Sequence, residues 1–155
     1  MRKVVLYSTR SGNTRKIAED IASELNCESL RISQAYSTPN IDLNCYDLIF
    51  IGTGILAGNP NEHITNYLEK VDIKEPKSFA IFLTWGGAGK TDKLVIDKLK
   101  RILKSKGQKV LKNCYTCYGG WRLLRRGHPN CEDAKTARKW AKKTAIEFQL
   151  NFNAK

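Results

Sequence analysis

The sequence predicts an α/β fold: a doubly wound, five-stranded parallel sheet of strand order 2-1-3-4-5 with helices on both faces. Strand-like apolar runs alternate along the chain with patterns that repeat at helical spacing, an order typical of βαβ units. The first and third runs are apolar throughout, as in parallel strands that are buried on both faces. Right-handed crossovers leave few other topologies, and 155 residues fit a single domain over residues 1–155.

The first half of the chain supplies three predicted strands. Residues 3–8 form the first, and residues 14–25 form a helix whose apolar side chains share one stripe. Residues 27–32 are polar enough for a strand at the edge of the sheet, and a loop over residues 34–46 follows. Residues 47–52 form the third strand, which is strongly apolar.

Capping residues mark two helices in the rest of the chain. Asn59 as the cap and Pro60 in the first turn predict a helix that ends near Lys70. Asn130, with Asp133 three positions later, predicts the start of the last helix. Between them the pattern predicts a strand at residues 79–84, a helix at 90–105, a strand at 109–117 and a loop at 118–129.

A hydroxyl-rich turn follows the first strand. Its residues are Ser8, Thr9, Arg10, Ser11, Gly12, Asn13 and Thr14. A strand, such a turn and a helix together gather backbone N–H groups that can hold a phosphate, and the hydroxyls and the Asn13 amide can add hydrogen bonds. Gly12 lets the backbone approach a ligand closely. The alternative is an ordinary turn in which a hydroxyl caps the helix.

Three more glycine-containing loops follow the other central strands. Their candidate ligand-binding residues are Thr53, Gly54, Ile55, Leu56, Ala57 and Gly58 after the third strand, Thr84, Trp85, Gly86 and Gly87 after the fourth, and Cys117, Tyr118, Gly119 and Trp121 after the fifth. In open parallel sheets, ligands bind beyond the carboxyl ends of the strands, where the strand order reverses. The sequence therefore predicts one binding rim made of these loops and the hydroxyl-rich turn.

The pattern Ser8-x-x-Ser11-Gly12-Asn13-Thr14 resembles the FMN phosphate loop of the flavodoxins, and residues 46–53 are similar to the third strand of that family. The resemblance implies that residues 53–58 and 84–87 hold the isoalloxazine ring, with Trp85, Tyr118 or Trp121 against its faces and Leu56 a candidate for one of them. It also implies that a backbone group at Ala57–Gly58 bonds to flavin N5, and that glycine lets this peptide flip. Arg10 departs from the family pattern.

The resemblance implies an electron carrier that cycles FMN between redox states for a protein partner, with the flavin supplying the redox chemistry. Two alternatives stay open. One is an FMN-dependent oxidoreductase of the same fold that acts on a quinone or a porphyrin. The other is a flavodoxin-like interaction module without a redox role.

The charge of the chain is unevenly distributed. Residues 1–78 hold 9 Lys and Arg and 10 Asp and Glu, whereas residues 79–155 hold 18 and 5. A patch of this kind attracts an acidic partner, so we expect a redox partner with an acidic docking face. No nucleic-acid-binding motif accompanies the charge, and no stretch is apolar enough to span a membrane. Five cysteines without dense spacing predict reduced thiols and a cytoplasmic location.

Two further motifs have alternative interpretations. Residues 86–91 end in Gly-Lys-Thr like a nucleotide-binding loop, but threonine occupies position 84, where that pattern requires its first glycine. Cys114-x-x-Cys117 could be a dithiol or part of a zinc site. The pattern favours buried cysteines on a strand, because no helix opens at the pair.

Overall fold

A parallel sheet forms the centre of the computed structural model, which describes residues 1–33, 41–121 and 123–153. The strands are β1 (Lys3–Ser8), β2 (Glu28–Arg31), β3 (Leu48–Leu56), β4 (Asn59–Pro60), β5 (Ser78–Trp85), β6 (Lys109–Val110) and β7 (Tyr115–Tyr118). The main path runs β2-β1-β3-β5-β6, and β7 also pairs with β5. Apart from the short β4 pairing, every pair is parallel. The predicted order is therefore confirmed.

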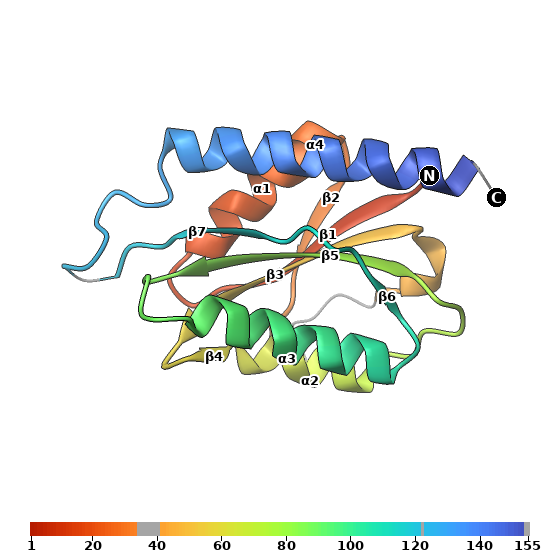
Figure 1. The fold of residues 1–155 in the computed structure, drawn as a ribbon, viewed down its shortest axis with the longest axis horizontal. Coiled ribbons are helices and arrows are strands. Elements are labelled where there is room, and N and C mark those ends of the chain that lie inside the picture. The colour runs from red at the N-terminus through yellow and green to blue at the C-terminus, as the bar shows by residue number, and fades with distance from the viewer. Residues whose placement is uncertain (34–40, 122, 154–155) are drawn as a thin grey trace.

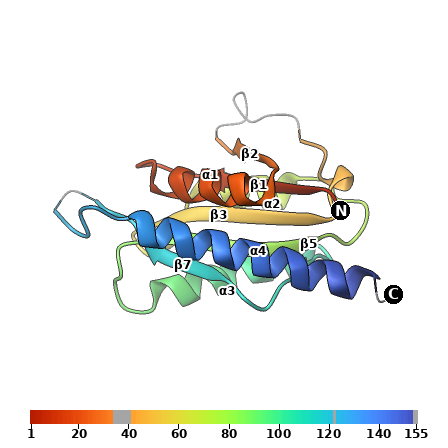
Figure 2. The same cartoon turned by 90° about the horizontal axis from the view of Figure 1, so that it is seen from above.

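Helices cover both faces of the sheet (Figure 1). On one face lie α1 (Asn13–Leu25) and α4 (Cys131–Asn153), and on the other lie α2 (Glu62–Lys70) and α3 (Thr91–Ser105). The view from above shows α4 running along the sheet (Figure 2). Arg138 of α4 pairs with Asp20 of α1 at 2.9 Å. None of the described helices combines the length and apolarity needed to cross a bilayer.

Two apolar layers hold the helices to the sheet. Val5, Phe50 and Phe82 point toward α1 and α4, where Ala137 and Ala141 are fully buried. The opposite layer includes Ile49, Ile51 and Ile81 from the strands and Ile64, Leu99 and Leu103 from the helices. At about 1.5–3 kcal/mol for each large side chain buried, these layers are the main stabilising term of the fold.

The predicted fifth strand is interrupted. Ser78 and Phe79 pair with Lys109 and Val110, and pairing resumes between Phe82 and Tyr115. Residues 111–114 therefore lie opposite only two residues of β5, so the edge strand bulges outward. The apolar pattern over residues 109–117 could not reveal these extra residues, because two of the four, Leu111 and Cys114, remain half-buried.

The predicted start of the second helix is wrong by two residues. β3 continues to Leu56 and turns back as β4, in which Pro60 pairs with Ile55. Asn61 then caps α2 by accepting a bond from the His63 N–H. A proline is tolerated at such a sheet edge as well as in a first helical turn, and this double preference caused the error.

The predicted cap of the last helix is confirmed. Asn130 Oδ1 accepts bonds from the N–H groups of Glu132 and Asp133, and Asp133 Oδ2 accepts one from the Asn130 N–H. In the predicted loop over residues 34–46, Leu43–Cys45 form a 3₁₀ turn. Residues 34–40 of that loop lie outside the described part of the chain.

Candidate functional site

The loops of the predicted rim lie together at the end of the sheet where β5 and β7 point, on the left of Figure 1. The carboxyl ends of parallel strands lie at the same edge of a sheet. The carboxyl ends of β1, β3, β5 and β7 therefore lie together here. Direct contacts between the loops show how closely they meet.

The hydroxyl-rich turn leads into α1 without a side-chain cap. Gly12 occupies the cap position with φ of 88°, a left-handed conformation that suits glycine. The first N–H groups of a helix need partners, so the start of α1 offers donors to an anion. Thr9 Oγ1 accepts a bond from the Gly12 N–H at 3.0 Å and braces the turn. Ser8 is buried, whereas Arg10 and Ser11 are exposed.

Thr14 joins three of the loops. Its Oγ1 lies 2.8 Å from Thr84 Oγ1 in a buried hydrogen bond. A Cβ atom on Gly54 would lie 3.3 Å from the same Thr14 oxygen, so the loop after β3 packs directly on this pair. One of the two hydroxyls donates its proton to the oxygen of the other. The hydroxyl that accepts this bond can donate its own proton to a ligand.

Asn13 connects the fourth loop. Its Nδ2 donates to the Gly120 carbonyl at 2.8 Å. A Cβ atom on Gly119 would lie 2.9 Å from that same nitrogen, so a side chain at position 119 would displace the Asn13 amide. Position 119 thus fixes the distance between the loop after β7 and the start of α1.

The loop after β3 is a tight β-hairpin rather than an open loop. Leu56 pairs with Asn59, and the two residues between them, Ala57 and Gly58, have φ of 48° and 76°. Two positive φ values are the pattern of a type I′ turn. Inverting the Ala57–Gly58 peptide leads to a type II′ turn, which favours glycine at the first position. Ala57, and the bond from Asn59 Nδ2 to its carbonyl at 3.1 Å, restrain the flip that the resemblance implies.

An aromatic and cationic cluster occupies the loops after β5 and β7. The rings of Trp85 and Tyr118 are stacked, with centroids 6.2 Å apart. The Arg125 guanidinium lies 4.1 Å from the centre of the Tyr118 ring, and the His128 ring meets Tyr118 edge-on at 5.6 Å. Gly87 approaches the Tyr118 ring so closely that a Cβ there would lie 2.8 Å from it.

Apolar side chains are exposed around this cluster. They are Leu56, Trp121, Leu123 and Leu124, which are 46%, 55%, 80% and 54% exposed. Trp121 and Leu124 pair through two backbone hydrogen bonds of 2.9 Å, and Leu124 packs over Gly86. Single exposed leucines are unremarkable, but a group of this kind at one edge indicates a ligand or protein contact.

The two cysteines of the C-x-x-C motif lie in opposite layers of the structure. Cys117 is buried beneath α1 and α4, whereas Cys114 packs against the layer of α2 and α3. The sheet separates them, so they do not form a dithiol pair. Burial raises the pKa of the Cys117 thiol to about 12. Within the described residues no group of three or more His, Cys, Asp or Glu could hold a metal ion.

The sequence pattern of the flavodoxin domain matches residues 4–125. The chain belongs to the flavodoxin family. It is 37% identical over 150 residues to an uncharacterised protein, MJ0298, of Methanocaldococcus jannaschii, a match that covers 92% of this chain and 97% of that protein.

Solved structures share this fold. A WrbA-like flavodoxin from Agrobacterium tumefaciens superposes with a TM-score of 0.79 at 16% identity, over 96% of this chain and 98% of that one. A flavoprotein from Lactobacillus acidophilus NCFM, solved in complex with FMN, superposes with a TM-score of 0.58 at 25% identity, over 76% and 92% of the two chains.

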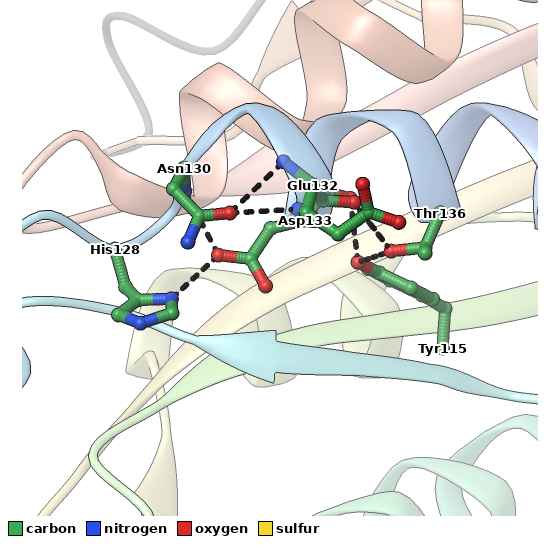
Figure 3. Close-up of polar contacts among 6 residues, drawn as sticks. All are labelled: Tyr115, His128, Asn130, Glu132, Asp133 and Thr136. Atoms are coloured by element: carbon green, nitrogen blue, oxygen red, sulfur yellow. Dashed lines mark hydrogen bonds and ion pairs between the residues drawn. The ribbon is translucent and has the colours of Figure 1, made fainter.

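Two residues at this rim, Arg125 and His128, are not among the site residues predicted from the sequence. Arg125 lies over Tyr118, but no local pattern distinguishes it from its basic neighbours in the sequence. His128 lies just before the last helix, and its Nδ1 lies 2.6 Å from Asp133 Oδ2 (Figure 3). The spacing His128-x-x-x-x-Asp133 before a capped helix was a usable signal.

Proposed function

We propose that this protein binds FMN at the rim described above and carries electrons for a protein partner. The single observation that carries the proposal is the meeting of the loops around Thr14, beside a helix start that lacks a side-chain cap. The FMN complex of the Lactobacillus acidophilus flavoprotein supports the choice of ligand.

The phosphate of FMN fits the start of α1. The N–H groups of the first helical turn and the positive end of the helix dipole favour an anion, and the exposed Ser11 hydroxyl can donate to it. Thr14 donates its hydroxyl proton when Thr84 supplies the proton of their mutual bond. Arg10 is exposed beside the turn and adds a positive charge.

The ring of FMN fits among the three other loops. Trp85 offers an aromatic face, Leu56 an apolar one, and the Ala57–Gly58 peptide a backbone group for flavin N5, whereas Arg125 covers the ring of Tyr118. The flavin supplies the electron-transfer chemistry when it is bound. Cys117 has no part in this proposal, because its thiol is buried in the core.

Titration with FMN and with riboflavin tests the phosphate assignment. Ser11→Ala and the double variant Ser11→Ala/Thr14→Ala should weaken FMN binding, with each lost hydrogen bond to the charged group costing about 1.5–3 kcal/mol. Riboflavin binding should change far less. Ser105→Ala, on the last residue of α3, is the matched control. Equal losses for both ligands, or no binding of FMN by the parent protein, would contradict the proposal.

The positive charge of residues 79–155 supports an acidic redox partner. The free thiols of all five cysteines support a cytoplasmic location. Arg125 and Arg126 are exposed next to the proposed flavin site, so a basic surface borders it. Electrostatic steering raises association rates by roughly 10–10³-fold and weakens with salt. Electron transfer with an acidic protein donor should therefore slow steeply as salt is added, and a salt-independent rate would contradict this assignment.

One observation favours a second candidate, an FMN-dependent oxidoreductase. An electron carrier requires no acid or base from the protein, yet His128 and Asp133 form a hydrogen-bonded pair beside the aromatic cluster. A substrate with a planar conjugated ring, such as a quinone, fits the exposed apolar side chains of Leu56 and Trp121.

A further inference from the structure

Three apolar side chains project from the loop between β7 and α4. Trp121, Leu123 and Leu124 are 55%, 80% and 54% exposed, and we call them the apolar tip. Two perpendicular views show this loop extending beyond the end of the sheet (Figure 1, Figure 2). A group of large apolar side chains that stays exposed in this way indicates a contact with a partner outside the chain.

Backbone hydrogen bonds stabilise the conformation of the loop. Trp121 and Leu124 each donate an N–H to the carbonyl of the other at 2.9 Å. At the base of the loop, the Gly120 N–H donates to the His128 carbonyl, and the His128 ring contacts Asp133 at the start of α4 (Figure 3). Backbone groups that are paired within the loop need no water, which is the condition for placing them against lipid.

The surroundings of the apolar tip are basic. Arg125 and Arg126 follow it directly and are exposed, although Arg125 also lies over the Tyr118 ring. The sequence contains no acidic residue between Asp97 and Glu132, so no carboxylate of that span offsets this charge. Positive charge at the base of an apolar tip is complementary to the negative surface of a membrane that contains anionic lipids.

A lipid surface fits the apolar tip better than the surface of a protein does. A stable protein contact buries about 800 Å² on each partner, whereas the tip offers three side chains on one turn. Tryptophan and leucine beside arginine are typical of segments that bind at the boundary between lipid headgroups and acyl chains. The arginine stems can lie along the apolar layer there while the guanidinium groups stay among the headgroups.

We propose that the apolar tip inserts into the surface of a membrane rich in anionic lipids, while Arg125 and Arg126 contact the lipid phosphates. One anchor alone binds a membrane weakly, whereas an apolar anchor combined with basic residues gives stable attachment. Leu124 lies over Gly86 of the loop after β5, so a protein attached in this way turns its rim toward the membrane. This inference does not depend on the binding of FMN.

Sedimentation with vesicles tests the apolar part of the proposal. The full chain should bind vesicles made of equal parts phosphatidylcholine and phosphatidylglycerol, and should not bind vesicles of phosphatidylcholine alone. Leu123→Ser should weaken this binding by roughly tenfold or more, because it removes apolar area that enters the lipid. Leu150→Ser is the matched control, since Leu150 is 67% exposed and lies near the opposite end of α4 from the tip. Equal losses in the two variants would overturn the inference.

Removal of the two arginines tests the electrostatic part. Arg125→Gln/Arg126→Gln should weaken binding to the anionic vesicles by about fivefold for each charge removed, and the remaining binding should depend less on salt. Arg101→Gln/Lys104→Gln removes the same charge from exposed positions near the end of α3 and should behave like the parent. Equal losses in both double variants would show that only the overall charge matters, which would overturn the inference.

Tryptophan emission shows whether the apolar tip enters the lipid. Anionic vesicles should shift the emission to shorter wavelength, and brominated acyl chains should quench it. Trp121→Phe should remove both responses, whereas Trp140→Phe should retain them. Poly-L-glutamate, an acidic polypeptide, should produce neither. A response to poly-L-glutamate but not to vesicles would assign the tip to an acidic protein and overturn the inference, as would failure of the parent protein to bind the anionic vesicles.

Discussion

The hydroxyl oxygens of Thr14 and Thr84 lie 2.8 Å apart, and the two residues are only 1% and 3% exposed. They come from the start of α1 and the end of β5, 70 positions apart in the chain. Their hydrogen bond fixes the hydroxyl-rich turn after β1 to the loop that carries Trp85. This buried contact therefore joins two of the loops of the proposed site.

Replacing both members of this pair should cost much less than the sum of replacing each one. Thr84→Val leaves the buried Thr14 hydroxyl without its partner, a loss of about 1–3 kcal/mol in the free energy of unfolding. In Thr14→Val/Thr84→Val no polar group is left unpaired, so the cost should fall well below the sum of the single losses. Urea unfolding of all four proteins measures this, with Thr116→Val of β7 as a control. Strictly additive losses would show that the bond contributes no coupling.

Asparagine at position 57 should stabilise the protein. Ala57 has φ of 48° and is followed by Gly58 at 76°, and Asn-Gly is the strongest sequence for a type I′ hairpin turn. Ala57→Asn should therefore raise the free energy of unfolding by about 0.5–1 kcal/mol, since left-handed alanine costs about 1–2 kcal/mol. Ala88→Asn, at an exposed position outside the positive-φ residues, should give no gain. A destabilised Ala57→Asn variant would contradict the turn assignment.

Trp85 should report the binding of FMN. It stacks on Tyr118 at the rim, whereas Trp140 packs edge-on against Phe50 in the layer beneath α4. Addition of FMN should quench tryptophan emission, and Trp85→Phe should remove most of the change. Trp140→Phe should retain it. If the response survives in Trp85→Phe, another tryptophan lies nearer the flavin.

The cysteines should differ widely in their reaction with an alkylating agent. Burial, and then the charge of Asp133, raise the pKa of Cys117 to about 12. At pH 8 the fraction present as reactive thiolate is then about 10⁻⁴. Cys45 and Cys131 are exposed and should be labelled first in peptide mass spectra taken over time. The folded protein should still protect Cys117 at about pH 9, and equal labelling of Cys117 and Cys131 there would contradict its burial.

Most of the architecture could be predicted because it depends on short-range patterns. The apolar run of β1 and the one-sided stripe of α1 identify those elements, and the Asn130 and Asp133 pair marks the start of α4. Errors arose where two arrangements share one pattern. Pro60 suits both a helix start and an edge strand, and residues 111–114 are half apolar although they bulge from the sheet.

Side-chain partners could not be predicted, since they depend on which distant loops meet. Nothing near Thr14 in the sequence indicates Thr84, and nothing near Tyr118 indicates that Arg125 covers its ring. The glycines were more informative. Gly87 and Gly119 were expected among the residues that approach a ligand ring, which stays a prediction, and each faces a protein side chain that a Cβ would strike.

Backbone amide shifts during an FMN titration test the central claim most directly. Binding at the rim should produce large changes at residues 11–14, 54–58, 85–87 and 118–120, and none in the surface groove at the far end of α4, which Leu111, Phe148 and Phe152 line. Saturation by FMN with shifts confined to the four rim loops would support the site. Shifts centred on that groove, or none anywhere at saturating FMN, would contradict it.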